Sequence, residues 1–272
     1  MVIILALIIG FLSAFVGSLV GLGGGIVFVP AMLFLYDHVA SFDWATPQTI
    51  VGISLVTMVF TGMSSTLAYY KLKRLDIKTG LLFLIGSLPG SVVGSWLNTK
   101  LDVESFSLYF GILMLVVFFM MLIDRQKLTR NRPLEITDKT RTFIIDNETY
   151  QYNVNVTAAF FLSFAVGMLS GLFGIGGGTI SVPIMILVFG IPVQIAIGTS
   201  MFMIFFISIM SATTHIFLGH IVWKYMLFFV IGSYIGGTVG AKTSKLFTGK
   251  TLEWFLKAVI VIAAIQLIYD SF

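Results

Sequence analysis

The sequence predicts an all-α integral membrane protein, a duplicated helical bundle with about eight hydrophobic segments. Of the 272 residues, 58% are hydrophobic and 10% are charged, whereas soluble domains carry roughly a quarter charged residues. The uncharged stretches are long enough for the roughly 20 residues that a helix needs to cross a hydrocarbon core. The chain has no Cys, which excludes disulfide frameworks and thiolate metal sites. The formal charge of +4 comes from basic residues between apolar segments, so it indicates membrane topology and not nucleic-acid binding.

An internal repeat organises the chain. Residues 21–30, with the sequence GLGGGIVFVP, recur as residues 174–183, GIGGGTISVP. The glycines and the proline coincide, and further matches follow in the same order: Gln48, Gly52 and Ser54 with Gln194, Gly198 and Ser200. Several separated matches in one order indicate a duplication. We therefore divide the chain into a first membrane repeat at 1–124, a polar connector at 125–156 and a second membrane repeat at 157–272.

Each repeat divides into four apolar segments. They are residues 2–36, 46–70, 77–98 and 105–123, followed by 157–190, 192–218, 223–247 and 252–270. As one helix, the first segment of each repeat would be about 50 Å long, far more than the membrane core. A glycine cluster interrupts both segments, and each Gly costs about 1 kcal/mol of helix propensity relative to Ala. We expect a helix, an unwound glycine break and a shorter second helix entered near Pro30 or Pro183.

The connector carries the highest concentration of charge in the chain. Its basic residues are Arg125, Lys127, Arg130, Arg132, Lys139 and Arg141. Because Lys and Arg accumulate in cytoplasmic loops, we expect the connector to be cytoplasmic. The alternating residues 141–153 around Asp146 and Asn147 also predict a small β-hairpin.

The relative orientation of the repeats depends on the broken segments. If each crosses the membrane once, the repeats are parallel; if each turns back as a re-entrant hairpin, the repeats are inverted, as in many transporters. The inverted arrangement places Lys242, Lys245 and Lys250 on the cytoplasmic side, whereas the parallel one leaves them outside. The distribution of basic residues therefore favours the inverted arrangement without excluding the parallel one.

The paired glycine breaks are the strongest candidate for a binding site. Irregular backbone at membrane depth is tolerated only where protein or water satisfies its polar groups, so such a break normally lines a cavity. The helices that resume there would point N-terminal N–H groups at a bound anion. The candidate substrate-binding glycines are Gly23, Gly24, Gly25, Gly176, Gly177 and Gly178. The alternative is that they only allow close helix packing, but their recurrence at matching places favours a site.

Polar residues that open the second segment of each repeat are further candidates. They are Gln48, Ser54, Gln194, Thr199 and Ser200. Neutral amide and hydroxyl donors suit an oxyanion that must be released again, but interhelical hydrogen bonding explains these residues equally well. We assign the spaced glycines at 86, 90 and 94 and at 232, 236 and 240 to close helix packing.

Titratable groups are scarce in the apolar segments. His215 interrupts an otherwise uncharged run, and its closeness to His220 and Lys224 predicts a position at the membrane interface. No Asp or Glu lies near the middle of a segment. The sequence therefore offers no carboxylate proton relay, and we expect no catalytic cluster, metal or cofactor.

These residues resemble a known family. A duplicated glycine-rich motif ending in Pro, followed by Gly198-Thr199-Ser200 in one half and Gly52-Ile53-Ser54 in the other, is similar to the TauE/SafE sulfite exporter family. This family is also called the sulfonate uptake permease family. Ile53 stands where a Thr is typical. The resemblance implies a plasma-membrane carrier that moves small anions, among them sulfite, sulfoacetate and related organosulfur compounds, in either direction.

The leading hypothesis is a secondary carrier for a small sulfur-containing or carboxylated anion, bound between two repeats that rock in alternating access. Its partners would be the anion and the lipid bilayer, and the oligomeric state, a homo-oligomer included, stays open. An intramembrane enzyme is a weaker hypothesis, because the segments lack a cluster such as His-Glu-x-x-His. The remaining alternative is a non-transporting membrane scaffold whose connector binds a partner.

Overall fold

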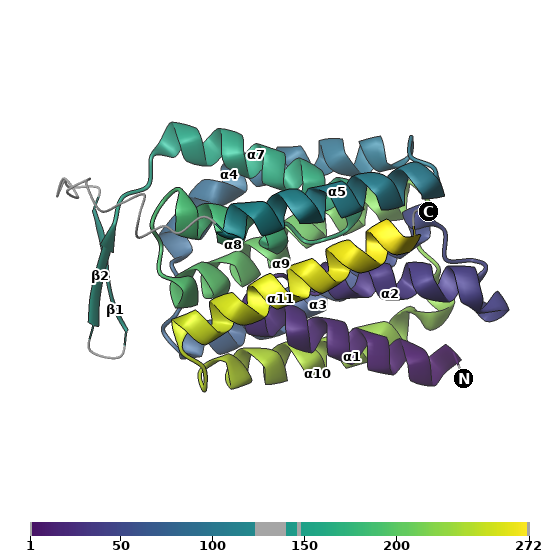
Figure 1. The fold of residues 1–272 in the computed structure, drawn as a ribbon, viewed down its shortest axis with the longest axis horizontal. Helices are drawn as coiled ribbons and strands as arrows, with labels where there is room; N and C mark the ends of the chain where they lie inside the picture. Colours follow the sequence, from purple (N-terminus) through teal and green to yellow (C-terminus); the bar gives the residue numbers. More distant parts are fainter. Residues whose placement is uncertain (1, 123–139, 146–147, 271–272) are drawn as a thin grey trace.

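The computed structural model describes residues 2–122, 140–145 and 148–270, which fold into helices apart from one pair of strands (Figure 1). The helices before the connector are α1 (Val2–Val20), α2 (Gly25–His38), the 3-10 turn η1 (Ala40–Phe42), α3 (Pro47–Lys71), α4 (Ile77–Asn98) and α5 (Val103–Leu122). The later elements are β1 (Arg141–Ile145), β2 (Glu148–Tyr152), α7 (Val156–Phe173), α8 (Gly178–Leu187), α9 (Val193–Phe217), α10 (Trp223–Ser244) and α11 (Gly249–Asp270). Among the described residues, five helices are long and apolar enough to cross a membrane: α1, α3, α4, α7 and α9. The chain is therefore a multi-pass membrane protein.

Each broken segment consists of two helices that fold back on one another. After α1 the chain unwinds, and the N–H groups of Leu22 and Gly23 both donate to Gly17 O. α2 then returns beside α1, because Leu5 and Ile9 of α1 line one groove together with Ala31, Phe34 and Leu35 of α2. The second break likewise lies against α7, since a Cβ atom at Gly177 would be 3.1 Å from the Val166 side chain. The predicted sequence of helix, glycine break and shorter helix is confirmed in both places.

The second helix of each pair begins earlier than expected. α2 starts at Gly25 and α8 at Gly178, so Pro30 and Pro183 lie inside these helices. The N-cap residues Gly24 and Gly177 have φ values of 105° and 73°, in the left-handed region that favours glycine. Once these glycines have turned the backbone, the chain can adopt helical geometry at once, and each proline removes only one hydrogen bond near the helix start.

The helices place the loops at two ends of the bundle. The connector end holds the loops 72–76, 188–192 and 245–248 together with the β-hairpin, and the far end holds the loops 39–46, 99–102 and 218–222. The described N-terminal part of α1 and the end of α11 also lie at the far end (Figure 1). The α1–α2 pair therefore begins and ends at the far end, whereas α7–α8 begins and ends at the connector end.

The most buried spans, α3 and α9, pack antiparallel through the centre, with 67% and 72% of their apolar windows buried. Around them, the closest helix pairs join the two halves of the chain. α4 runs along α7, and a Cβ at Gly94 would lie 1.8 Å from Met168 O. α1 runs along α10 in the same manner, with Gly236 against Phe11 O at 2.2 Å. The assignment of these glycine series to close helix packing is confirmed, and the pairs they make are α4–α7 and α1–α10.

The predicted β-hairpin is present and docks on the bundle. β1 and β2 pair antiparallel from Arg141 opposite Tyr152 to Ile145 opposite Glu148; the expected turn at 146–147 and the basic residues 125–139 lie outside the described residues. Both strands reach Asp76, the N-cap of α4: Arg141 Nη1 lies 3.0 Å from Asp76 Oδ1, and Tyr152 Oη donates to Oδ2 at 2.7 Å. Asp76 is 3% exposed.

The carboxylate of Asp76 therefore caps the N-terminus of α4 and also binds the β-hairpin. Besides its two hairpin partners, Asp76 Oδ1 accepts the N–H of Thr79 at 3.0 Å, and the Thr79 hydroxyl donates to Oδ2. Burial, and then the negative charge of Asp76, raise the pKa of the Tyr152 phenol, so this phenol stays a hydrogen-bond donor.

We predict that Asp76→Asn undocks the hairpin. The substitution leaves Arg141 without its counter-charge, and breaking one partner of a buried pair costs about 3–5 kcal/mol. Hydrogen exchange of the amides in β1 and β2 should accelerate strongly. Asp102→Asn is the matched control, because Asp102 also caps a helix, accepting the Ser105 N–H at 2.8 Å, but in an exposed position. Equal exchange in both variants would contradict this role of Asp76.

Candidate functional site

The two glycine breaks meet in the middle of the bundle. A Cβ at Gly25 would lie 2.3 Å from Gly174 O, and a Cβ at Gly178 would lie 2.3 Å from Gly21 O. Met58 of α3 and Ile204 of α9 pack over both breaks, with Met58 Sδ 2.3 Å from a Cβ at Gly176 and Ile204 Cδ1 2.6 Å from one at Gly178. We call residues 21–25 and 174–178, with Met58 and Ile204, the glycine crossing. All of these residues are buried, so the crossing is closed to both ends.

Two serines hold the crossing together through the backbone of the opposite half. Ser54 Oγ donates to Gly174 O at 2.7 Å, and Ser200 Oγ donates to Gly21 O at 2.6 Å. A carbonyl at the end of a broken helix has no partner within the helix, and in a membrane it cannot turn to water. These hydroxyl protons are therefore occupied with the breaks, and both predicted serines lie at the crossing.

The helices that leave the crossing present free N–H groups to it. The first hydrogen bonds of α2 run from Val27 and Phe28 to Gly24 O, so the N–H groups of Gly25 and Ile26 have no partner inside the helix. In α8 the first bonds run from Ile180 and Ser181 to Gly177 O in the same way. The positive ends of two helix dipoles therefore converge on one buried place.

Buried hydroxyls without partners surround the crossing in the second half of the chain. Five have no hydrogen-bond partner and are at most 1% exposed: Ser170, Thr179, Ser181, Ser208 and Ser211. Ser170 lies beside Gly177, with its Cβ 3.5 Å from a Cβ placed there. A buried hydroxyl without a partner costs roughly 1–3 kcal/mol, so these hydroxyls are candidate contacts for a polar ligand. Matching of the repeats could not find these residues, because the aligned first-half positions of Ser170, Thr179 and Ser181 are Gly17, Ile26 and Phe28.

Other predicted site residues lie away from the crossing. Gln48 Nε2 donates to Leu101 O at 2.7 Å and so closes the turn between α4 and α5 at the far end. Gln194 lies at the connector end, 3.3 Å from a Cβ at Gly249. Thr199 Oγ1 accepts the N–H of Asp76 at 3.0 Å, also at the connector end. The structure thus brings together the glycines, Ser54 and Ser200, but not the two glutamines or Thr199.

His215 is buried inside the bundle, in the last turn of α9 beside the far-end loop, and its position at the membrane interface stays a prediction. Its exposed fraction is 0%. Its Nε2 lies 3.4 Å from Gly171 O and its Nδ1 lies 2.9 Å from His220 Nδ1. The following loop folds back over the helix end, so that His220 contacts His215.

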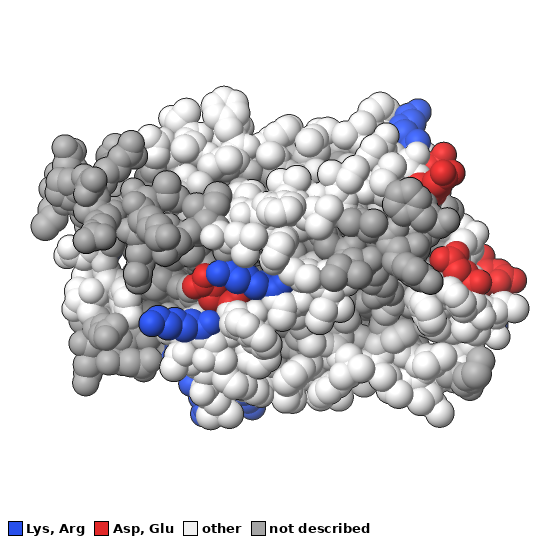
Figure 2. Space-filling view, viewed as in Figure 1, with Lys and Arg blue, Asp and Glu red and all other residues white. Residues whose placement is uncertain are grey.

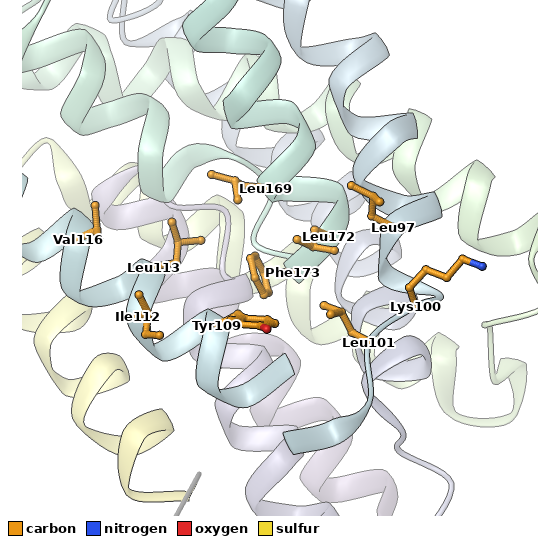
Figure 3. A pocket seen from close by; sticks show the side chains of 10 residues that line it. All are labelled: Leu97, Lys100, Leu101, Tyr109, Ile112, Leu113, Val116, Leu169, Leu172 and Phe173. Atoms are coloured by element: carbon orange, nitrogen blue, oxygen red, sulfur yellow. The ribbon is translucent and has the colours of Figure 1, made fainter. Parts of the chain in front are cut away.

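A groove on the side of the bundle offers no alternative anion site. A groove of about 480 Å³ lies between α4, α5 and α7. Its walls are Leu97, Lys100, Leu101, Tyr109, Ile112, Leu113, Val116, Leu169, Leu172 and Phe173. The one charged residue, Lys100, points away from the other side chains in Figure 3, and its Nζ lies over the Trp96 ring. Walls of this kind suit an apolar chain and not a charged one.

We predict that Ser54→Ala and Ser200→Ala each lower thermal stability. Either substitution leaves a buried carbonyl of the crossing without a donor, at a cost of about 1–3 kcal/mol. Thr213→Ala is the control on α9, because the Thr213 hydroxyl is exposed and bonds only to Ile209 O of its own helix at 2.7 Å. Thermal unfolding in detergent measures whether the two serine variants are less stable than the control. Unfolding temperatures of the serine variants that match those of the control would contradict the structural role.

Comparison with known proteins gives the family. The family model "Sulfite exporter TauE/SafE" matches residues 6–267. A "probable membrane transporter protein YunE" of Bacillus subtilis is 40% identical, with 98% of both chains covered. A "probable membrane transporter protein MJ0441" of Methanocaldococcus jannaschii is 25% identical over 94% of this chain and 91% of the relative. "Sulfite exporter TauE/SafE family protein 6" of Arabidopsis thaliana is 26% identical over 71% of this chain and 41% of the relative. No solved structure matches the chain.

These names describe transporters and not enzymes, and the family match spans both membrane halves and the connector. The resemblance stated from the glycine motifs is therefore confirmed. The chain belongs to the TauE/SafE sulfite exporter family.

Proposed function

We propose that the protein is a secondary carrier for a small oxyanion, such as sulfite, a sulfonate or a related carboxylate, which binds at the glycine crossing. The observation that carries the proposal is the convergence of two helix N-termini, at Gly25 and Gly178, on a buried place with unpartnered hydroxyls. Backbone N–H groups and hydroxyls bind an anion without a fixed cation, which favours release as well as binding. The family name supports sulfite and its relatives as the substrate class.

An inverted arrangement of the two halves supports alternating access. The α1–α2 hairpin enters from the far end and α7–α8 from the connector end, as expected for inverted repeats with broken helices near the middle of the membrane. We infer that the crossing becomes accessible from the far end when the helix pair α1–α2 moves. It becomes accessible from the connector end when the helix pair α7–α8 moves.

The close packing suggests which bodies move. We expected the two halves of the chain to rock as units. However, the helix pairs in backbone contact are α1–α10 and α4–α7, and each pair contains one helix from each half. Glycine-lined helix contacts are tight and resist separation. We infer that the α1–α10 pair and the α4–α7 pair each move as a unit, with α3 and α9 between the two pairs.

Charge at the two ends supports a cytoplasmic connector. The described basic residues at the connector end are Lys71, Lys73, Arg74, Lys78, Arg141, Lys242, Lys245 and Lys250, against Lys100 and Lys224 at the far end. Four described acidic residues lie at the far end, at the right in Figure 2; they are Asp37, Asp43, Asp102 and Glu104, while Asp76 and Glu253 lie toward the connector end. Because basic residues accumulate on the cytoplasmic side, we place the connector in the cytoplasm and the protein in the plasma membrane.

Substitution at the crossing tests the proposal. Gly24→Val and Gly177→Val place a branched side chain at positive φ, next to Ser13 O at 2.8 Å and to Val166 at 3.1 Å. We expect sulfite and sulfoacetate flux into proteoliposomes to fall to background while both variants still insert and purify as single species. Gly249→Val is the control, since only the Gln194 side chain lies near that position. Wild-type flux in the Gly24 and Gly177 variants would overturn the proposal.

A further inference from the structure

The two glycine breaks share a sequence motif but use their backbone donors differently. In the first break, the N–H groups of Leu22 and Gly23 both donate to Gly17 O, at 2.7 and 3.2 Å. The same positions in the second break are Ile175 and Gly176, and their N–H groups have no hydrogen-bond partner among the described residues. Because successive free N–H groups in a turn form a concave donor set, the second break is better suited to an anion than the first.

The first break is also packed more tightly than the second. A Cβ at Gly24 would lie 2.8 Å from Ser13 O, a backbone atom of α1. A Cβ at Gly177, the aligned position, would have no neighbouring atom closer than 3.1 Å. A Cβ at Gly176 would meet Met58 Sδ at 2.3 Å, but this sulfur lies near the end of a flexible side chain that can adopt another rotamer. The second break can therefore make room for a bound group more easily than the first.

The buried hydroxyls follow the same division between the halves. The five unpartnered hydroxyls of α7, α8 and α9 are those of Ser170, Thr179, Ser181, Ser208 and Ser211. Four of these positions carry no hydroxyl in the first half, where the aligned residues are Gly17, Ile26, Phe28 and Gly62. The fifth aligned residue is Ser65, whose Oγ already lies 2.7 Å from Ser18 Oγ. At these positions, free hydroxyls are therefore offered by the second half only.

Two of these hydroxyls belong to the second break itself. Thr179 is the second residue of α8, so its side chain lies in the first turn of that helix. Ser170 Cβ lies 3.5 Å from a Cβ placed at Gly177. Both side chains are completely buried. Ile26, which is aligned with Thr179, gives the first turn of α2 a buried apolar side chain instead. The crossing therefore combines hydrogen-bonding groups in the second half with apolar groups in the first.

We propose that the second break supplies the hydrogen bonds to the oxyanion head of the substrate, and that the first break faces the substituent which this head carries. Ser170 and Thr179 then determine specificity, beside the N–H groups of Ile175 and Gly176. The positive end of α2 adds to the electrostatic potential at the crossing without a direct hydrogen bond. This proposal rests on the anion-carrier function above. It names the residues that bind the head and predicts an oxyanion with a small apolar substituent, such as an alkanesulfonate.

Direct binding to protein in nanodiscs tests the assignment. We expect Thr179→Val and Ser170→Ala each to weaken the binding of sulfite and of methanesulfonate about tenfold or more, measured by calorimetry. Without ligand, neither variant should unfold at a lower temperature, because each loses a hydroxyl that has no partner. Thr61→Val and Ser163→Ala are matched controls that should keep wild-type affinity, since these buried hydroxyls bond to carbonyls of their own helices. Affinities equal to those of the controls, or a loss of stability without ligand, would overturn the proposal.

A substitution at the aligned position of the first half tests the orientation of the substrate. Methanesulfonate carries a methyl group where sulfate carries a fourth oxygen. We expect the wild type to bind methanesulfonate more tightly than sulfate. Ile26→Thr adds a hydroxyl to the first break and should reduce this preference about tenfold, whereas Thr179→Val should weaken both anions alike. Sulfate bound as tightly as methanesulfonate by the wild type, or an unchanged preference in Ile26→Thr, would overturn the orientation. Binding of none of the three anions by the wild type would instead count against the carrier function.

Discussion

Two hydrogen bonds make the centre of this membrane bundle feasible. A chain that unwinds at membrane depth exposes carbonyl groups that lipid cannot satisfy, and here Ser54 and Ser200 supply donors to Gly174 O and Gly21 O. Each donor comes from the half of the chain opposite to the break. Neither α1–α2 nor α7–α8 can therefore satisfy the carbonyl of its own break. The packing of α3 against α9 fixes the position of both breaks. The free N–H groups of α2 and α8 point to one place only because the carbonyls are already satisfied.

Much of this arrangement could be predicted from local sequence. The two clusters of glycines break their helices, so the two breaks and the spaced glycines of α4 and α10 could be located, whereas whether each broken segment crosses or turns back could not be decided. The alternation in residues 141–145 and 148–152 located the β-hairpin. What the sequence could not supply was the partner of each group. Thr199 looked like a substrate ligand, yet it accepts the Asp76 N–H, because α4 begins beside α9. The burial of His215 within the protein could not be predicted, because it depends on the fold of the following loop.

The two ends of the bundle differ more than the repeated motifs suggest. At the connector end, Ser18, Ser65 and Tyr69 satisfy one another or nearby carbonyls, and the hairpin is fastened through Asp76. Toward the far end, Ser170, Ser208 and Ser211 have no partners. Unpartnered hydroxyls lie on both sides of the crossing, because Thr179 and Ser181 of α8 lie toward the connector end, but the network of Ser18, Ser65 and Tyr69 has its partners within the bundle.

In the proposed transport cycle, the α1–α10 and α4–α7 pairs move against each other, so that the crossing opens to one end at a time. Because the chain has no Cys, spin labels at two introduced cysteines measure this motion without interference. One pair, Leu246 with Val156, reports the connector end, and the other, Trp223 with Trp96, reports the far end; all four side chains are exposed. We expect sulfite to change the two distances in opposite senses. The distance between labels at Ile3 and Trp223, within the α1–α10 pair, should stay unchanged. Distances that stay fixed at both ends, or widen together, would contradict this cycle.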